Sequence, residues 1–584
     1  MTSILIIAPL LFSLITLISH VHIRNVLAVF FVVYLSALSV ANILYIDTTT
    51  TFGLSHQVHY LFILLDVVVL IYFLWQGIIT KNLLVKLFTT LQIILYATVV
   101  FLSPKFIFND ILVDQISSFM YLVINIVGGI IIIYALKYIE SEDFSRFKKN
   151  SFIAILFFFL SVMNFIVSTN NLEIFFLLFE LTTLCSYVLI GFRGDAVSTQ
   201  NAQRALWMNQ IGGVAILVAL LFSISQYQSV YFDALIQNVD EVYLLPVVLL
   251  AIAAFVKGAT VPFDKWLLGA MVAPTPVSAI LHSATMVKIA PYLMLKLAPA
   301  MSGFVSLTIT LIGTFVFFTA SLLALSKNYF KEILAYSTIA LLALMMALAA
   351  IGTPEAITAC LTLLVFHAIS KALLFLQAGI LEKSFQLKYV NDIDGLINHS
   401  PLVVFFIIVG FASLTLPPFG AFIGKFLAIE SMAGEIVNNP LYALSLIFLA
   451  LGSVFLTLLY FKVVTKLFAK DVDSQVEQLT ISKFYIIPSF LLLFLLIVGI
   501  DVSLELELLN SLEIMVPLIL MGIIPLLFAT LLFRKAHRVK EYHCGEKDDV
   551  VLNMYYFQMS HKVQKYINIV AIVGMLTLIV GVLL

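Results

Sequence analysis

The sequence VKGATVPFDKWLLGAMVAPTPVSAILHSATMVKIAPYL occupies residues 256–293. It is apolar enough to lie in a membrane, yet Lys257 near its start is followed at once by glycine and then by proline. This pattern is typical of a helix that breaks inside a bilayer, where the freed backbone carbonyls must face protein or water. Transporters build their ion sites near such discontinuous helices.

The composition of the whole chain is that of a membrane protein. Of 584 residues, 62% are hydrophobic and 11% are charged, whereas soluble chains carry about 25% charged residues. The formal net charge of −1 leaves no basic excess for nucleic-acid binding. The three cysteines (Cys185, Cys360 and Cys544) lie far apart without a CxxC pair. We therefore expect no metal site, haem or iron–sulfur cluster in this chain.

Apolar stretches of roughly 20 residues, the length that crosses a bilayer, predict about 18 transmembrane helices and an all-α integral membrane protein. Their approximate limits are 3–19, 25–46, 59–79, 83–104, 115–138, 151–168, 171–192, 205–225, 243–268, 276–298, 303–326, 332–352, 355–381, 401–434, 440–468, 484–500, 513–533 and 565–584. Loops rich in Lys and Arg, such as 137–150, alternate with segments that have none, such as 226–242 and 501–513. Because cytoplasmic loops carry these cations, the alternation predicts that both termini lie outside the cytoplasm.

Several ionisable residues lie inside the predicted spans. Each costs about 2.5–3.5 kcal/mol on insertion scales, so function is the default interpretation. Glu180 follows the apolar run 175–179, and the alternative is a carboxyl that fixes helix packing. A buried lysine can release and take up a proton, which makes Lys257 a candidate carrier. The alternative for Lys257 is a side chain that snorkels to the cytoplasmic face, which Asp264 and Lys265 mark.

The next helices add further candidates. His282 and Lys288 share one apolar helix that we expect to kink at Pro291. Histidine titrates near neutrality and suits a proton relay, while a hydrogen-bonded packing role is equally open for His282. His367 and Lys371 are spaced i,i+4, which places them on one helix face. The alternative for Lys371 is a position close to a helix end.

A second interrupted helix reads LPPFGAFIGK at residues 416–425 and ends on Lys425. Two helices broken by Gly and Pro in two halves of a chain indicate an inverted repeat, in which Lys257 and Lys425 are counterparts. Asp66, in an early span, is an isolated acid to which the sequence assigns no role.

These segments resemble the antiporter-like subunits of respiratory complex I, of Mrp sodium/proton antiporters and of energy-converting hydrogenases. The resemblance rests on FELTTLCSYVLIGF (179–192), the run 256–293, KEILAYSTIA (331–340), FHAISKALLF (366–375) and LTLPPFGAFIGKF (414–426), within residues 110–430. It implies two inverted five-helix repeats, each with a broken helix. It also implies three regions: N-terminal spans 1–110 with extra helices over 59–104, an antiporter-like core 111–435, and C-terminal spans 436–584 with a cytoplasmic loop 534–564.

The resemblance further implies roles for single residues. The acid matching Glu180 pairs with the lysine matching Lys257. The lysine matching Lys288 lies at the centre of a hydrophilic axis that the histidine matching His367 continues. Lys425 would connect this axis to one membrane face. The tail departs from complex I, because it is too short for a long lateral helix, and its motif EYHCGE (541–546) is similar to the large membrane subunit of Ech-type hydrogenases.

We therefore predict a proton-translocating subunit of a multi-subunit redox-driven pump in a bacterial or archaeal cytoplasmic membrane. It would be the non-redox membrane subunit of a translocating oxidoreductase complex, beside other membrane subunits. The peripheral redox arm would hold the iron–sulfur clusters and, in hydrogenases, nickel–iron. The alternatives are an Mrp-type sodium/proton antiporter subunit, the membrane subunit of an energy-coupled inorganic-carbon uptake complex, and a structural anchor that no longer conducts.

Overall fold

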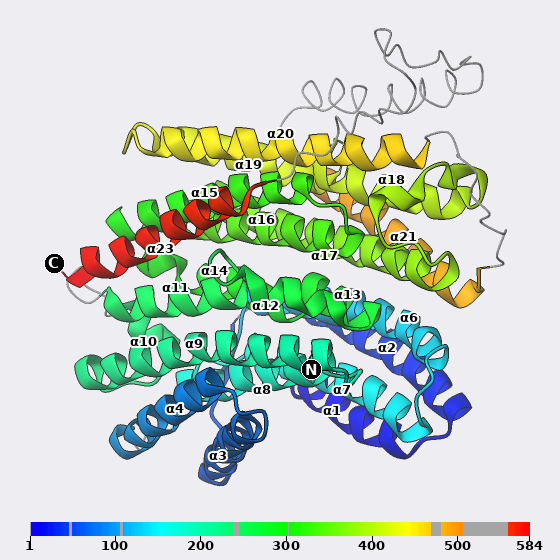
Figure 1. Cartoon of the computed structure of the whole chain (residues 1–584). Coiled ribbons are helices and arrows are strands. Elements are labelled where there is room, and N and C mark those ends of the chain that lie inside the picture. Colours follow the sequence, from blue (N-terminus) through cyan, green and yellow to red (C-terminus); the bar gives the residue numbers. More distant parts are fainter. Residues whose placement is uncertain are drawn as a thin grey trace.

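A computed structural model describes residues 2–45, 49–104, 109–237, 244–301, 303–417, 419–468, 481–505 and 559–583, and it is almost entirely helical (Figure 1). Fifteen helices in this part of the chain are long and apolar enough to cross a membrane, and two shorter apolar helices accompany them. They coincide with every predicted span except 513–533. That span, the loop 534–564 and the EYHCGE motif lie outside the described residues or, for the last residues of the loop, at their edge.

The N-terminal region consists of four helices and a short two-stranded sheet, whose strands flank the last two of these helices in the chain. Its elements are α1 (Thr2–Ile18), α2 (Val21–Tyr45), β1 (Thr50–Phe52), α3 (His56–Ile79), α4 (Leu83–Leu102) and β2 (Ile111–Val113). The two strands pair antiparallel, with Thr50 opposite Val113. The helices α3 and α4 form a hairpin at the lower edge of Figure 1, where α4 packs against α9 and α3 against α8.

The first half of the core follows. Its elements are α5 (Gln115–Leu122), η1 (Val123–Val127), α6 (Gly128–Glu140), α7 (Arg146–Ile166), α8 (Leu172–Ile190), α9 (Ala196–Tyr227), α10 (Phe232–Gln237), α11 (Leu245–Lys257), α12 (Asp264–Gly269), η3 (Ala270–Val272), α13 (Thr275–Ser283), η4 (Met286–Lys288), α14 (Ile289–Leu297) and η5 (Ala298–Ala300). The helices α8, α9 and α11 pack side by side, and α5, η1 and α6 together make one span.

The second half of the core and the C-terminal helices complete the molecule. They are α15 (Gly303–Ser326), α16 (Phe330–Ile351), α17 (Pro354–Ser384), η6 (Val390–Ile393), η7 (Leu396–Asn398), α18 (Pro401–Thr415), α19 (Gly420–Glu435), α20 (Tyr442–Leu467), α21 (Lys483–Glu505) and α23 (His561–Leu583). The helix α17 packs against α16, α18, α19 and α13, and so joins the two halves. The proposed inverted symmetry between the halves stays a prediction.

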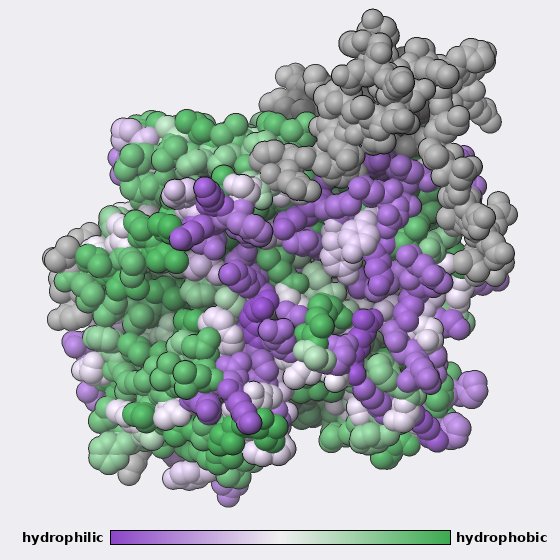
Figure 2. Space-filling view, in the orientation of Figure 1, coloured by the Kyte–Doolittle hydropathy of each residue, from purple (hydrophilic) through white to green (hydrophobic). Residues whose placement is uncertain are grey.

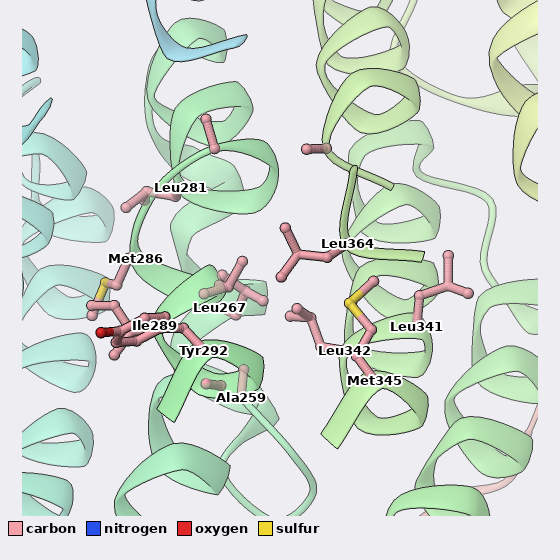
Figure 3. Packing of buried hydrophobic residues seen from close by; sticks show 14 of the residues in the cluster. Ala259, Leu267, Leu281, Met286, Ile289, Tyr292, Leu341, Leu342, Met345 and Leu364 are labelled. Carbon is pink, nitrogen blue, oxygen red and sulfur yellow. The ribbon is translucent and has the colours of Figure 1, made fainter. Parts of the chain in front are cut away.

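Burial separates central helices from lipid-facing ones. In α16 and in segment 275–300, every residue of the most apolar stretch is buried. In the corresponding stretches of α3 and α4, 28% of the residues are buried. Figure 3 shows Leu267 of the first half lying opposite Leu342 of α16 and Leu364 of α17 across this centre. Hydrophobic residues cover the left flank of the view in Figure 2, and hydrophilic residues gather over its middle and right. A protein that exposes this much apolar surface is suited to lipid.

The first predicted break lies where expected, with one unexpected residue at its centre. The helix α11 ends at Lys257, and the next residues form a Schellman motif, because the amide of Thr260 bonds the carbonyl of Phe255 and the amide of Ala259 bonds that of Val256. The left-handed residue of the motif is Ala259, with φ 52°, and not the preceding glycine. The Trp266 indole caps the carbonyl of Val256 at 2.9 Å. The break therefore leaves few polar backbone groups unpaired.

The second break also lies where predicted, but the expected kink at Pro291 is wrong. The helix α18 ends at Thr415 and α19 begins at Gly420. In the preceding half, α13 ends at Ser283 and a 3-10 turn over 286–288 leads into α14, so the chain bends before Lys288. Pro291 lies in the first turn of α14, where its missing N–H breaks no helical hydrogen bond.

Asp110 links the start of α3 to the start of α8. Its buried carboxylate accepts hydrogen bonds from the amide of Leu54 (2.8 Å), the imidazole of His59 (3.1 Å) and the side-chain amide of Asn171 (2.8 Å). Burial alone would raise the pKa of Asp110, but these hydrogen bonds, led by that of His59, outweigh it and lower the pKa. A carboxyl with a lowered folded pKa stabilises the protein above its unfolded pKa and loses that effect as pH falls.

We predict that Asp110→Asn lowers the stability of the detergent-solubilised protein by about 1–3 kcal/mol at pH 7, because charge-assisted hydrogen bonds are lost. Thermal unfolding followed by circular dichroism measures this. The gap between variant and wild type should close as pH falls below about 4, the usual range of an Asp pKa. Asp143→Asn, at an exposed position, is the control. A gap that is constant from pH 7 to pH 3 would contradict the role of the charge.

Candidate functional site

Glu180 lies inside the bundle, on α8, and a glutamine from the N-terminal hairpin holds it. The Gln92 side-chain amide of α4 donates to Glu180 Oε1 at 2.9 Å and to the carbonyl of Gln210 at 3.1 Å. Both side chains are fully buried. Glu180 Oε2 has no hydrogen-bond partner in the described part of the chain. Gly213 of α9 makes room for this pair, because a Cβ there would lie 2.0 Å from Glu180 Oε1 and 2.3 Å from Gln92 Nε2.

Lys257 points toward α8 and not toward an aqueous face. Its ammonium donates to the Thr183 hydroxyl at 2.7 Å and to the Phe179 carbonyl at 3.1 Å, and it lies 3.8 Å from the centre of the Phe179 ring. The side chain is fully buried, which rules out the snorkelling alternative. Lys265 is exposed, whereas Asp264, expected to mark the same face, is buried.

Glu180 and Lys257 are neighbours without being an ion pair. No ion pair within 4.0 Å joins them among the contacts of the described residues. The Thr183 hydroxyl lies between them, since it accepts from Lys257 and interacts with the Glu180 carboxyl. The hydroxyl donates to the Phe179 carbonyl at 3.1 Å, and because its O–H can rotate, Thr183 is placed to couple the two charges.

Lys288 meets His367 directly. The ammonium lies 2.7 Å from His367 Nδ1 and donates to the Leu364 carbonyl at 3.2 Å. His367 Nε2 has no hydrogen-bond partner in the described part of the chain. A lysine against one ring nitrogen, with the other ring nitrogen free, is a geometry in which the imidazole can accept a proton on one side and release it on the other.

Lys371 lies one turn further along α17 than His367. Its ammonium donates to the Ser337 hydroxyl at 2.5 Å and to the Leu334 carbonyl at 3.0 Å, both on α16. The residue is fully buried and lies mid-helix, because α17 continues to Ser384. The alternative position near a helix end is therefore wrong.

His282 and Lys425 are buried without a direct bond to the other candidates among the described contacts. The His282 ring packs on Phe375 at 4.8 Å, and neither of its nitrogens has a hydrogen-bond partner there. Electrostatic interactions link His282 to Lys371. Lys425 lies in α19, just beyond the second break, with 5% of its surface exposed.

The three inner lysines share one mode of attachment. Each ammonium docks on one turn of a neighbouring helix, where it meets a backbone carbonyl and a polar side chain three or four residues further on. The pairs are Phe179 with Thr183, Leu334 with Ser337, and Leu364 with His367. An ammonium has three N–H donors. The contacts among the described residues use two of these donors at each lysine.

The sequence did not single out the partners Gln92, Thr183 and Ser337. A glutamine inside an apolar span predicts a buried hydrogen-bond partner, because a buried amide needs partners, so Gln92 could have been found from the sequence. The hydroxyls carried no such signal, because serine and threonine are common in membrane helices and bond their own backbone. No group of three or more His, Cys, Asp or Glu that could hold a metal ion occurs among the residues described.

Comparisons with known proteins show which family and which fold the chain resembles. Residues 169–459 match the family described as "NADH:quinone oxidoreductase/Mrp antiporter, TM", and residues 109–148 match "NADH-Ubiquinone oxidoreductase (complex I), chain 5 N-terminus". Together these regions cover more than half of the chain. The chain is 32% identical to Na(+)/H(+) antiporter subunit A1 of Staphylococcus aureus strains JH9 and Newman over 346 residues, which are 55% of this chain and 43% of each relative. It thus spans less than half the length of these relatives.

A solved structure has a similar fold. It is a chain of the membrane-bound sulfane sulfur reductase, described as an archaeal respiratory membrane complex. The TM-score is 0.61 at 20% sequence identity, and the match covers 78% of this chain and 96% of that one. At this identity the likeness concerns the fold alone.

We predict that Gly213→Ala displaces Glu180 or Gln92 and lowers stability by about 1–3 kcal/mol, because the added methyl group overpacks the site. Thermal unfolding of the purified protein measures the effect. Gly434→Ala is the matched control, since no atom lies within 4 Å of a Cβ there and alanine favours a helix. Equal unfolding temperatures for Gly213→Ala and wild type would show that α9 does not press on the Glu180 carboxyl.

Proposed function

This chain belongs to the antiporter-like membrane subunit family of complex I and Mrp antiporters, and we propose that it translocates protons as one subunit of a redox-driven respiratory complex. The observation that supports this most is the attachment of three buried lysines to polar turns of neighbouring helices. A membrane interior does not keep such charges idle. In the proposed route these buried residues follow one another from Glu180 to Lys425 inside the bundle.

The proposed transfer moves protons between neighbouring groups. Protonating or deprotonating Glu180 changes the field at Lys257, and Thr183 lies between them. Interacting charges in a low-dielectric interior titrate together, so a proton lost at one lysine favours uptake at the next. The Lys288–His367 contact of 2.7 Å carries the step to α17, and Lys371 and Lys425 continue it toward a membrane face.

Orientation and partners belong to the same proposal. The Lys- and Arg-rich loops would lie in the cytoplasm of a bacterium or archaeon, with both termini on the other side. Other membrane subunits would dock beside the chain, and iron–sulfur clusters and a nickel–iron centre would belong to a peripheral arm. The three-region division of the chain, with its core at 111–435, and the inverted repeats are proposed on the same footing.

A second candidate function has its own support. The 32% identity to a Na(+)/H(+) antiporter subunit favours an exchanger that a sodium or proton gradient drives without an electron donor. The two candidates differ in one observable, which is the need for a redox partner.

We predict that Lys257→Ala abolishes proton translocation while the complex still assembles, because the variant removes the ammonium that Thr183 and Glu180 face. Acidification of sealed membrane vesicles, followed with a pH-sensitive dye, measures the rate. Lys388→Ala, at an exposed loop position, should behave as wild type. Full pumping by an assembled Lys257→Ala complex would refute the assignment of Lys257 to the pathway.

Gentle affinity purification from native membranes separates the two candidates. We expect mass spectrometry to find iron–sulfur proteins and a hydrogenase-like or related redox pair with the chain. If small membrane subunits alone accompany it and no redox protein does, the redox-driven proposal fails and the exchanger takes its place.

A further inference from the structure

The hairpin α3–α4 carries a buried acid that the pathway above does not use. Asp66 of α3 has 2% of its surface exposed, and its Oδ1 has no hydrogen-bond partner in the described part of the chain. The hairpin precedes both regions matched to known families and packs on α8 and α9. An ionisable residue held inside a membrane is read as a functional site by default.

The helix registers place Asp66 beside the Glu180 site. On α4, the Tyr96 hydroxyl interacts with the Asp66 carboxyl, and Gln92, one turn away, donates to Glu180. The Tyr96 ring stacks on Phe176 at 5.6 Å, one turn before Glu180 on α8. The antiparallel helices α4 and α8 thus bring Tyr96 level with Phe176 and Gln92 level with Glu180.

The same faces continue to one end of the bundle. His59 precedes Asp66 by two turns on α3, and Glu173 precedes Glu180 by two turns on α8. Ser103, the C-cap residue of α4, follows Tyr96 by about two turns. At this end Ser103 donates to Glu173, and His59 bonds Asp110. Electrostatic interactions link Asp66 to both Glu173 and Glu180. The seam of α3, α4 and α8 is therefore lined with polar groups from the bundle end to Glu180.

Acceptors outnumber donors along this seam. Asp66 Oδ1, Gln92 Oε1 and Glu180 Oε2 are all buried oxygens without a donor among the described contacts. An unpaired buried acceptor costs about 1–3 kcal/mol. A proton on either carboxyl supplies a donor, so the seam favours holding at least one transferable proton.

We propose that Asp66 is a further proton-binding site, which connects Glu180 through the α3–α4 hairpin to the membrane face that bears His59 and Glu173. The inference rests on the proposed proton translocation and adds a lateral branch to it. In each step one carboxyl gives up a proton and the next carboxylate takes it, with the Tyr96 hydroxyl beside Asp66 as donor and acceptor. No other reactant takes part. The hairpin is then a conducting element and not just a lipid-facing brace.

The test substitutes Asp66→Asn in the full complex, since asparagine keeps the shape and the interaction with Tyr96 but has no acidic proton to bind and release. We expect the rate of proton translocation in vesicles to fall by on the order of tenfold or more, and Asp66→Glu to restore most of it. Phe73→Leu is the matched control, because Phe73 lies two turns further along α3, fully buried but apolar. It should lower stability without lowering the rate per assembled complex.

A second readout reports the site itself. Infrared difference spectra of the purified protein across a pH step should contain a carboxyl band that Asp66→Asn removes and Phe73→Leu keeps. A wild-type rate and an unchanged spectrum in Asp66→Asn would overturn the proposal. So would an equal loss of rate in Phe73→Leu, or the failure of Asp66→Glu to restore it, because Asp66 would then act through packing. If wild type moves no protons, the proposed function fails, while the infrared band still decides whether Asp66 binds a proton.

Discussion

The desolvation of charge inside the bundle is the constraint on which the rest of this structure depends. An ammonium taken out of water must be given acceptors by protein, and each inner lysine finds them on one turn of a neighbouring helix. Lys257 uses α8, Lys371 uses α16 and Lys288 uses α17. The helices that carry the charges are thereby fixed to the helices that solvate them. The contacts that pack these helices are therefore the same contacts that solvate the buried charges.

The backbone breaks serve this constraint. Ending α11 at Lys257 and bending the chain before Lys288 places both lysines near helix ends, where side chains reach across to adjacent helices. The break after Lys257 accepts an alanine in the left-handed region, which costs roughly 1–2 kcal/mol relative to glycine. Ala259 is fully buried, so packing around it fixes this conformation. The α3–α4 hairpin also solvates a buried charge, because Gln92 of α4 gives the Glu180 carboxyl a hydrogen-bond donor.

The sequence predicted the spans and both Gly/Pro breaks because hydropathy and backbone restriction are local properties. It also marked the seven candidate residues, since a charge in an apolar run stands out in any register. It missed the position of the bend before Lys288, where Thr285 and not Pro291 departs from helical geometry. It missed Gln92, Thr183 and Ser337 as partners, because these depend on which helix faces which. Such pairings are long-range and leave no periodic trace in one chain.

The most direct measurement of the central claim uses the purified complex in sealed liposomes in a sodium-free buffer. An electron donor suited to the co-purified redox partner is added, and a pH-sensitive dye records the lumen. A redox-driven proton pump should give a pH change that begins with the donor, needs no sodium and is abolished by a protonophore. A pH change that appears only when a sodium gradient is applied, with or without the donor, would contradict it.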